Sequence, residues 1–221
     1  MRPLRLAIPK GALFAESVAL LQKAGLDVEG LQDAGRQLVI ITEDIEYYIV
    51  RPVDAPVFAA YGGVDCALCG RDSLLEAALE VVELVDLGYG ACRFVVAEPA
   101  TAKDRADDMY AHLSILRVAT KYPRITAAYY DSIGVQVEIV KMYGNIELAP
   151  LCGMADRIVD ITATGTTLRE NNLVIVDEVL ASTARFVGNP ASVRTDPRVR
   201  QLAARLAAAC AQQAETAAGG R

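Results

Sequence analysis

Short apolar runs alternate with polar turns and with segments of helical periodicity along the first part of the chain. Runs of the length and composition of buried strands occupy residues 5–9, 38–41 and 64–68. Apolar positions over residues 13–24 recur with helical spacing until Gly25 ends the pattern. Shorter helices are predicted over residues 54–61 and 73–80. This order of strand, turn and helix predicts an α/β fold whose strands are mainly parallel.

A second series of the same kind follows Gly90. Strands are predicted over residues 91–97, 115–119, 135–142, 157–160, 173–180 and 184–187, and helices near residues 103–110 and up to Ser132. A final helix is predicted to start at Asp196-Pro197, with an apolar face made by Val199, Leu202, Ala203, Leu206 and Ala209. The alanine- and glycine-rich end is expected to fray.

Polar side chains directly follow several of the predicted strands. Lys10, Asp72, Lys121 and Thr164 each stand just after such a strand. Ligands of α/β sheets gather at the carboxyl ends of strands, so this shared position groups the four residues as candidates for a site. Taken alone, each is more often a solvated surface residue or a helix cap, and Asp72 stands close to an expected helix start.

The segment 160–168 carries the most informative chemistry. It holds four threonines around Gly165 and follows a short apolar run. Hydroxyl donors, a glycine that permits unusual backbone geometry and the N–H groups of a following helix together make a pocket suited to a phosphate. For the loop alone, a threonine-rich turn with ordinary capping is the alternative. It is not a Walker loop, because no lysine follows the glycine.

Composition narrows the class of partner. The 221 residues are 53% hydrophobic and carry a formal net charge of −6, which fits a globular protein and argues against nucleic acid as a partner. No apolar stretch is long enough to span a bilayer, and the N-terminus lacks the apolar core of a signal peptide. We therefore expect no membrane association and a cytoplasmic location.

The cysteines and the histidine do not suggest a metal or nucleophilic site. Cys66 and Cys69 lie in an apolar strand, where residues three apart face opposite sides. The other three cysteines are isolated, whereas a zinc site needs a second pair. Buried structural thiols are therefore predicted. His112 is the only histidine, so a histidine-based triad is not expected.

Residues 147–168 taken together resemble the signature of the ATP phosphoribosyltransferase family, which catalyses the first committed step of histidine biosynthesis. The motif begins at Glu147, passes Asp160 and ends in Thr-Gly-x-Thr-Leu at Leu168. Other stretches resemble family motifs in family order, at residues 9–11, 51–52, 70–72 and 117–123. Two positions depart from the pattern: Ala12 stands where many relatives have Arg, and Asn145 replaces the usual Ser.

The resemblance implies two α/β domains of the type II periplasmic-binding-protein kind, with the active site in a cleft between them. Domain I would comprise residues 1–89 and 180–221. It would be discontinuous because the chain would cross twice, near residues 88–90 and 173–180. Domain II, residues 90–179, would carry the loop for phosphoribosyl pyrophosphate.

The same resemblance implies a pentosyltransferase that joins N1 of ATP to C1 of 5-phosphoribosyl 1-pyrophosphate and releases pyrophosphate. Glu147 and Asp160 would bind ribose hydroxyls or a magnesium-bound pyrophosphate, and together with Lys10 they are the catalytic candidates. Magnesium would be bound mainly by the substrate. The alternative for Glu147 is an acid that complements a helix dipole.

The remaining candidates bind substrate. The 5-phosphate loop would consist of Thr162, Ala163, Thr164, Gly165, Thr166, Thr167 and Leu168. The ATP site would include Gly11, Arg51, Arg71, Asp72, Lys121 and Tyr122. Within it, Tyr122 would stack on adenine and Asp72 would accept a hydrogen bond from the adenine amino group.

The chain resembles the short form of the family, because the residues after Pro190 suffice for one long helix but not for a further domain. Short relatives work with a regulatory subunit that resembles histidyl-tRNA synthetase, so a hetero-oligomer is implied, and a homodimer also fits. Two alternatives remain. One is a non-catalytic ligand-binding module of the same architecture, since fold does not fix function, and the other is an inactive structural paralogue.

Overall fold

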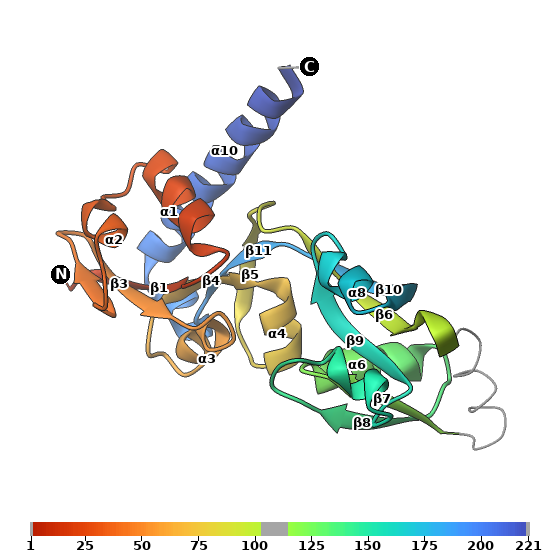
Figure 1. Cartoon of the computed structure of the whole chain (residues 1–221). Coiled ribbons are helices and arrows are strands. Elements are labelled where there is room, and N and C mark those ends of the chain that lie inside the picture. Colours follow the sequence, from red (N-terminus) through yellow and green to blue (C-terminus); the bar gives the residue numbers. More distant parts are fainter. Residues whose placement is uncertain (1, 103–114, 220–221) are drawn as a thin grey trace. The chain divides into compact units, whose positions relative to one another are not determined.

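The computed structural model describes residues 2–102 and 115–219, with side chains described for residues 2–101 and 115–213. The chain divides into two compact units (Figure 1). Unit 1 combines residues up to Gly90 with residues from Thr183 onward, and unit 2 spans Ala91–Ser182. The helix expected near residues 103–110, like His112, lies outside the described residues.

Unit 1 is built on a six-stranded sheet with the order β2-β3-β1-β4-β11-β5. Its strands are β1 (Leu4–Pro9), β2 (Val39–Ile41), β3 (Ile45–Val50), β4 (Cys66–Gly70), β5 (Val82–Asp86) and β11 (Ala184–Gly188). Its helices are α1 (Phe14–Lys23), α2 (Glu29–Gln32), α3 (Ala55–Ala60), α4 (Arg71–Ala77), α9 (Pro190–Thr195) and α10 (Pro197–Gly219). Strand β1 pairs in parallel with β3 and β4, whereas β2, β11 and β5 pair antiparallel with their neighbours.

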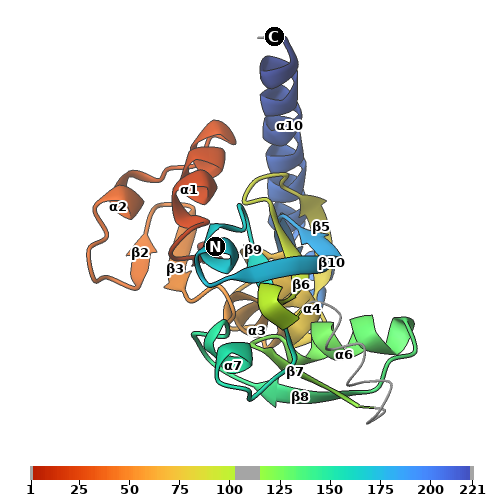
Figure 2. The ribbon, with the colours of Figure 1, turned by 45° about the vertical axis from the view of Figure 1, so that its right-hand side comes forward.

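The central strands of unit 1 are covered on both faces, which explains their continuous apolar runs. Along β1, Leu6 and Ile8 enter one core cluster and Ala7 enters the other. Helices α1 and α10 pack together over the first face, and α3 contributes to the second. The C-terminal part of α10 extends beyond the sheet (Figure 2).

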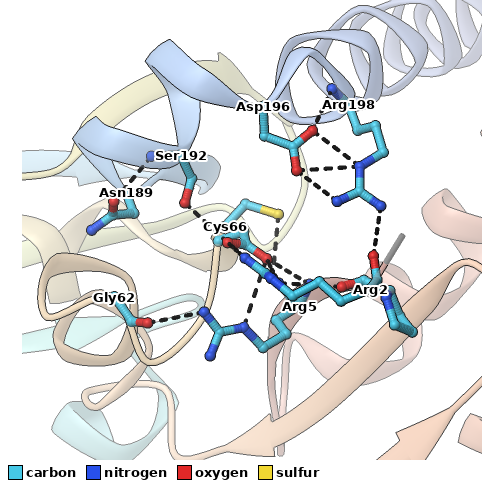
Figure 3. Close-up of polar contacts among 10 residues, drawn as sticks. Arg2, Arg5, Gly62, Cys66, Asn189, Ser192, Asp196 and Arg198 are labelled. Carbon is cyan, nitrogen blue, oxygen red and sulfur yellow. Dashed lines mark hydrogen bonds and ion pairs between the residues drawn. The ribbon is translucent and has the colours of Figure 1, made fainter.

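Hydrogen bonds to one buried carboxylate connect the N-terminal and C-terminal chain segments of unit 1 (Figure 3). Asp65, which precedes β4, accepts hydrogen bonds from both terminal nitrogens of Arg2 (2.7 Å each) and from the Arg5 backbone N–H (2.9 Å). The Ser192 hydroxyl in α9 also donates to it, at 2.9 Å. Asn189 caps α9 through the N–H groups of residues 191 and 192. The start of β1, the start of β4 and α9 therefore meet at one polar group.

Unit 2 is built on a five-stranded sheet with the order β10-β6-β9-β7-β8. Its strands are β6 (Cys92–Pro99), β7 (Leu116–Thr120), β8 (Val137–Lys141), β9 (Arg157–Thr162) and β10 (Leu173–Ser182). Its helices are α6 (Pro123–Ser132), α7 (Leu148–Leu151) and α8 (Thr166–Glu170), with a 3₁₀ turn at Ala100–Ala102. Helix α6 covers one face of the sheet, and α7 and α8 cover the other.

The expectation of mainly parallel sheets is wrong in detail, because both sheets are mixed. In unit 2, β7 pairs in parallel with β8 and β9, but β6 pairs antiparallel with β9 and β10. The parallel strands lie where helices connect them. Apart from β2, the antiparallel pairings involve the strands on either side of the two crossings between units, β5 and β6 and then β10 and β11.

One predicted domain boundary and one predicted strand end differ from the structure. The expected domain boundary between residues 179 and 180 falls inside β10, which pairs with β6 as far as Ser182. The strand expected to end at Asp160 continues to Thr162, because Ile161 and Thr162 still pair with β6. Asp160 is therefore a strand residue and not the first residue after the strand.

Candidate functional site

In unit 1, three candidate segments lie at one edge of the sheet. The parallel strands β3, β1 and β4 are neighbours, and they end at Val50, Pro9 and Gly70. Lys10, Arg51 and Arg71 follow those ends directly, and all three are exposed. The Lys10 N–H donates to the Val50 carbonyl (2.9 Å), which joins two of the strand ends. The structure thus brings the predicted basic residues of unit 1 to a common edge.

Glycines at this edge permit close backbone turns. Gly11 has a φ of 84°, in the region that favours glycine, and its carbonyl accepts from the Phe14 N–H as α1 begins. A Cβ at Gly70 would lie 2.0 Å from Oδ1 of Asp72, so the Asp72 carboxyl group folds back over Gly70. Gly70, and not Asp72, occupies the N-cap position of α4. Asp72 therefore lies in the first helical turn, where its charge complements the dipole.

A pocket of about 560 Å³ adjoins Lys10 and Gly11 within unit 1. Phe14 and the segment that leads into β2 complete its wall, and Arg36 is among the lining residues. Sequence reasoning did not single out Arg36, because it follows no predicted strand. It adds a second basic side chain to a pocket that already contains Lys10.

In unit 2, the other candidates gather at the carboxyl edge of three parallel strands. Neighbouring strands β9, β7 and β8 end at Thr162, Thr120 and Lys141. Thr120 is buried, donates from Oγ1 to the Val159 carbonyl (2.7 Å) and accepts from the Tyr122 N–H (3.0 Å). These bonds fix the turn that presents Lys121 at the edge.

The aromatic residues at this edge differ in exposure. The Tyr122 ring is half-buried and meets Phe94 edge-on, with ring centroids 4.7 Å apart, so it contributes to the core of unit 2. Tyr143 follows β8 and is 85% exposed, and the Lys141 ammonium lies 5.5 Å from its ring centroid. Tyr143 was not singled out from the sequence, where a tyrosine after a strand is not distinctive.

Two acids and one base interact electrostatically at the same edge. Burial raises the pKa of Asp160 above its ordinary value, the negative charge of Glu147 raises it further, and Lys121 opposes the shift. One Asp160 oxygen accepts from the Ile161 N–H at 2.8 Å. Glu147 is half-buried at the N-cap of α7, yet its side chain makes no capping bond. The carboxylate of Glu147 is thus not used to cap the helix.

The threonine loop turns sharply between β9 and α8. Gly165 has a φ of 72°, and its N–H donates to Thr162 Oγ1 at 2.7 Å. The hydroxyl oxygens of Thr164 and Thr166 lie 3.0 Å apart. Helix α8 begins at Thr166, and the N–H groups of a first turn have no acceptor within their own helix. The loop therefore presents hydroxyl and N–H donors, as an anion site requires.

Leu168 and Arg169 have roles that sequence reasoning did not assign. The Leu168 side chain is buried in the core with Ile158 and Leu173, so it anchors the loop and only its backbone is available to a ligand. Arg169 donates from Nη1 to the Thr164 carbonyl (3.0 Å) and from Nη2 to Thr166 Oγ1 (3.1 Å). Its position three residues after Thr166 on a helix is the signal that would have found it.

The prediction of buried thiols holds for Cys66 and Cys69, whereas Cys92 and Cys210 are half-buried and Cys152 is exposed. Cys66 and Cys69 are buried in different core clusters on opposite faces of the sheet, and burial raises the pKa of both. Among the described residues, no group of three or more His, Cys, Asp or Glu side chains is arranged to hold a metal ion. None of the described helices combines the length and apolar character needed to cross a membrane.

Comparison with known proteins places this geometry in one family. A family model described as ATP phosphoribosyltransferase (HisG) matches residues 51–208. The ATP phosphoribosyltransferase of Rubrobacter xylanophilus is 45% identical over 194 residues, which cover 88% of this chain and 90% of that protein. The Moorella thermoacetica enzyme of the same name is 48% identical over 199 residues, covering 88% and 87%.

Solved structures agree with the sequence comparison. A chain of the ATP phosphoribosyl transferase (HisG:HisZ) complex from Thermotoga maritima superposes with a TM-score of 0.79 at 35% identity, covering 95% of this chain and 99% of that one. A histidine kinase sensor domain similar to periplasmic binding proteins has a TM-score of 0.57 at 14% identity. The GluR0 ligand-binding core has a TM-score of 0.58 at 11% identity, so these two share the fold alone.

Proposed function

Because the chain belongs to the ATP phosphoribosyltransferase family, we propose that it condenses ATP with 5-phosphoribosyl 1-pyrophosphate to give N1-(5-phosphoribosyl)-ATP and pyrophosphate, the first step of histidine biosynthesis. The observation that carries the proposal is the carboxyl edge of unit 2. There the threonine loop, the acid Glu147 and the base Lys121 follow neighbouring strands, and the acid Asp160 lies near the end of β9.

The threonine loop holds the 5-phosphate of the ribose. The hydroxyl groups of Thr164, Thr166 and Thr167 are exposed at the turn, and the first turn of α8 adds N–H donors. Hydrogen bonds to an anion contribute roughly 1.5–3 kcal/mol each. Thr162 supports the turn instead, because its hydroxyl oxygen accepts from the Gly165 N–H.

Glu147 and Asp160 bind the ribose hydroxyls or the pyrophosphate with its magnesium. Both side chains offer hard oxygen ligands, and the pKa of Asp160 is raised mainly by burial and further by the charge of Glu147, which fits a site that receives a cation. With magnesium and pyrophosphate held there by Glu147 and Asp160, the charge that develops on the leaving group would be neutralised. Lys121 supplies a fixed positive charge beside the same acids.

Each unit carries candidate contacts for ATP. Gly11, Arg51, Arg71 and Asp72 stand at the carboxyl edge of unit 1, and Lys121 and Tyr122 stand at that of unit 2. Lys10 and Arg36 line one pocket of unit 1 and give it two basic side chains. The transition state of such a transfer resembles an oxocarbenium ion, so alignment of the substrates matters most and can supply roughly 7–11 kcal/mol.

We further propose a cytoplasmic enzyme that assembles with a regulatory subunit. The support is the biosynthetic family and the Thermotoga maritima structure, whose title names a HisG:HisZ complex. A homodimer of the catalytic chain is compatible with the same assembly.

The proposal is tested with purified chain, ATP, 5-phosphoribosyl 1-pyrophosphate and magnesium. Formation of the adduct is followed by its ultraviolet absorbance, with and without the partner subunit. Reactions lacking either substrate and reactions of Asp160→Asn are the controls. Absence of adduct under both conditions, from a chain that melts cooperatively, would overturn the proposed activity.

A further inference from the structure

The turn of the threonine loop is held from outside by a single side chain. The guanidinium of Arg169 bonds to the Thr164 carbonyl through one terminal nitrogen (3.0 Å) and to Thr166 Oγ1 through the other (3.1 Å). These acceptors flank Gly165, whose φ is 72°. A Cβ at Gly165 would lie 3.4 Å from Nη1 of Arg169, so the guanidinium packs against the turn itself. One planar group therefore bridges both sides of the loop.

The two hydrogen bonds of Arg169 determine which hydroxyl of the loop donates and which accepts. A guanidinium can only donate, so Thr166 Oγ1 accepts from Arg169. A hydroxyl polarised by a charged donor becomes a better donor in turn, which favours donation from Thr166 to Thr164 Oγ1 across the 3.0 Å that separate them. Thr164 Oγ1 also accepts weakly from the Thr166 N–H (3.4 Å). The Thr164 hydrogen is then left to point at an incoming ligand, and Thr164 is exposed.

The charge of Arg169 is also uncompensated by protein. Both acceptors of its hydrogen bonds are neutral, and no carboxylate in the described part of the chain forms an ion pair with it. Its positive charge therefore stands beside a loop whose exposed threonine hydroxyls and first-turn N–H groups can donate to a ligand. An anionic ligand at the loop is the group that such an arrangement favours.

We propose that Arg169 is a positioning residue for the phosphoribosyl substrate: acting through the hydroxyl of Thr166, it orients the hydroxyl of Thr164 toward the 5-phosphate. This inference rests on the proposed function of the loop. The inference goes beyond that function because it assigns a chain of hydrogen bonds, in which the guanidinium donates to Thr166, Thr166 donates to Thr164, and Thr164 donates to a phosphate oxygen.

The test compares Arg169→Ala, Arg169→Gln and Arg169→Lys in steady-state assays with each substrate varied. We expect the Ala and Gln variants to raise the KM for 5-phosphoribosyl 1-pyrophosphate by about 10- to 100-fold, as expected for loss of a charge-assisted contact. The KM for ATP should change by less than about twofold. Lys keeps the charge but has no planar fork to bridge two acceptors, so it should restore only part of the affinity.

A double-mutant cycle separates positioning from simple attraction. If Arg169 acts through Thr166, then Arg169→Ala should cost much less in a Thr166→Val background than in the wild type. Glu170→Gln, an exposed change on the same helix, is the matched control and should alter neither KM. Thermal unfolding of every variant excludes loss of the fold as the cause.

Three results would overturn the proposal: additive effects in the cycle, full rescue by lysine, or equal rises in both KM values. If the wild type forms no adduct, the same variants are tested by calorimetric binding of 5-phosphoribosyl 1-pyrophosphate. A wild type that binds it and an Arg169→Ala variant that binds it more weakly would support the role of Arg169 without the catalytic function. Equal binding by both, or binding by neither, would contradict it.

Discussion

Replacement of Asp65 by asparagine should weaken unit 1 strongly and in a pH-dependent way. The Asp65 side chain is 1% exposed and accepts hydrogen bonds from Arg2, from the Arg5 backbone and from Ser192. Burial alone would raise its pKa, but these donors outweigh burial and lower the pKa from its ordinary value of 3.8 to about 2. The ionised carboxylate is therefore better stabilised in the folded chain than in the unfolded one.

The magnitude follows from that shift. A pKa lowered from 3.8 to about 2 corresponds to about 2 kcal/mol of stability. Because the pKa is lower in the folded state, this stability is present above pH 4 and is lost as the pH falls toward 2. Removing one partner of a buried ion pair costs about 3–5 kcal/mol. Arg2 is 53% exposed and can be hydrated, so we expect Asp65→Asn to cost less, about 2–3 kcal/mol at pH 7.

Urea unfolding between pH 7 and pH 2 measures both effects. The free energy of unfolding of wild type and Asp65→Asn should converge as the pH approaches 2. Asp196→Asn is the control, because Asp196 pairs with the nearby Arg198 in a more exposed setting and should contribute less. A loss below about 0.5 kcal/mol at pH 7, or a difference between the two proteins that does not vary with pH, would refute the reasoning.

Three other predictions concern the proposed activity. Thr166→Ala and Asp160→Asn should each cost about 1.5–3 kcal/mol in kcat/KM for 5-phosphoribosyl 1-pyrophosphate with little change in melting temperature, and unchanged kinetics would remove both residues from the site. Tyr122→Ala should raise the KM for ATP and also lower the melting temperature, because the Tyr122 ring packs against Phe94. The control Tyr143→Ala should leave the melting temperature unchanged, because Tyr143 is exposed. A Tyr122→Ala variant with an unchanged melting temperature would contradict the packing role. The isolated chain should be weakly active and insensitive to histidine, with activity and inhibition both conferred by the partner subunit; calorimetric binding of histidine to the chain alone would place the regulatory site here.

The sequence predicted the central strands β1 and β4 and missed β3 and β5. Residues of β1 and β4 form unbroken apolar runs because helices cover both sides of them. Strands β3 and β5 are only partly buried and contain charged residues, so their pattern is ambiguous. The antiparallel pairing of β10 and β11 depends on partners distant in sequence, which local periodicity cannot identify.

The part of the candidate site that one continuous segment forms could be predicted from the sequence. The threonine loop is one continuous segment, so its composition alone indicated anion binding. Arg36 and Tyr143 were missed, because their relevance depends on which edge or pocket the fold brings them to. Arg169 was missed for a related reason, since its role lies in where the guanidinium points and not in its place after a strand.

Two aspartates of this chain differ in how far their hydrogen-bonding capacity is satisfied within the protein. Asp65 is saturated by four donor contacts, and its pKa is lowered. Asp160 accepts one N–H bond from its neighbour, faces Glu147, and its pKa is raised. Folding destabilises the ionised form of Asp160, and under the proposed function a bound cation or ribose hydroxyls would offset that cost. The contrast between these two aspartates is therefore a physical reason to propose a role in substrate binding for Asp160 and a role in the stability of unit 1 for Asp65.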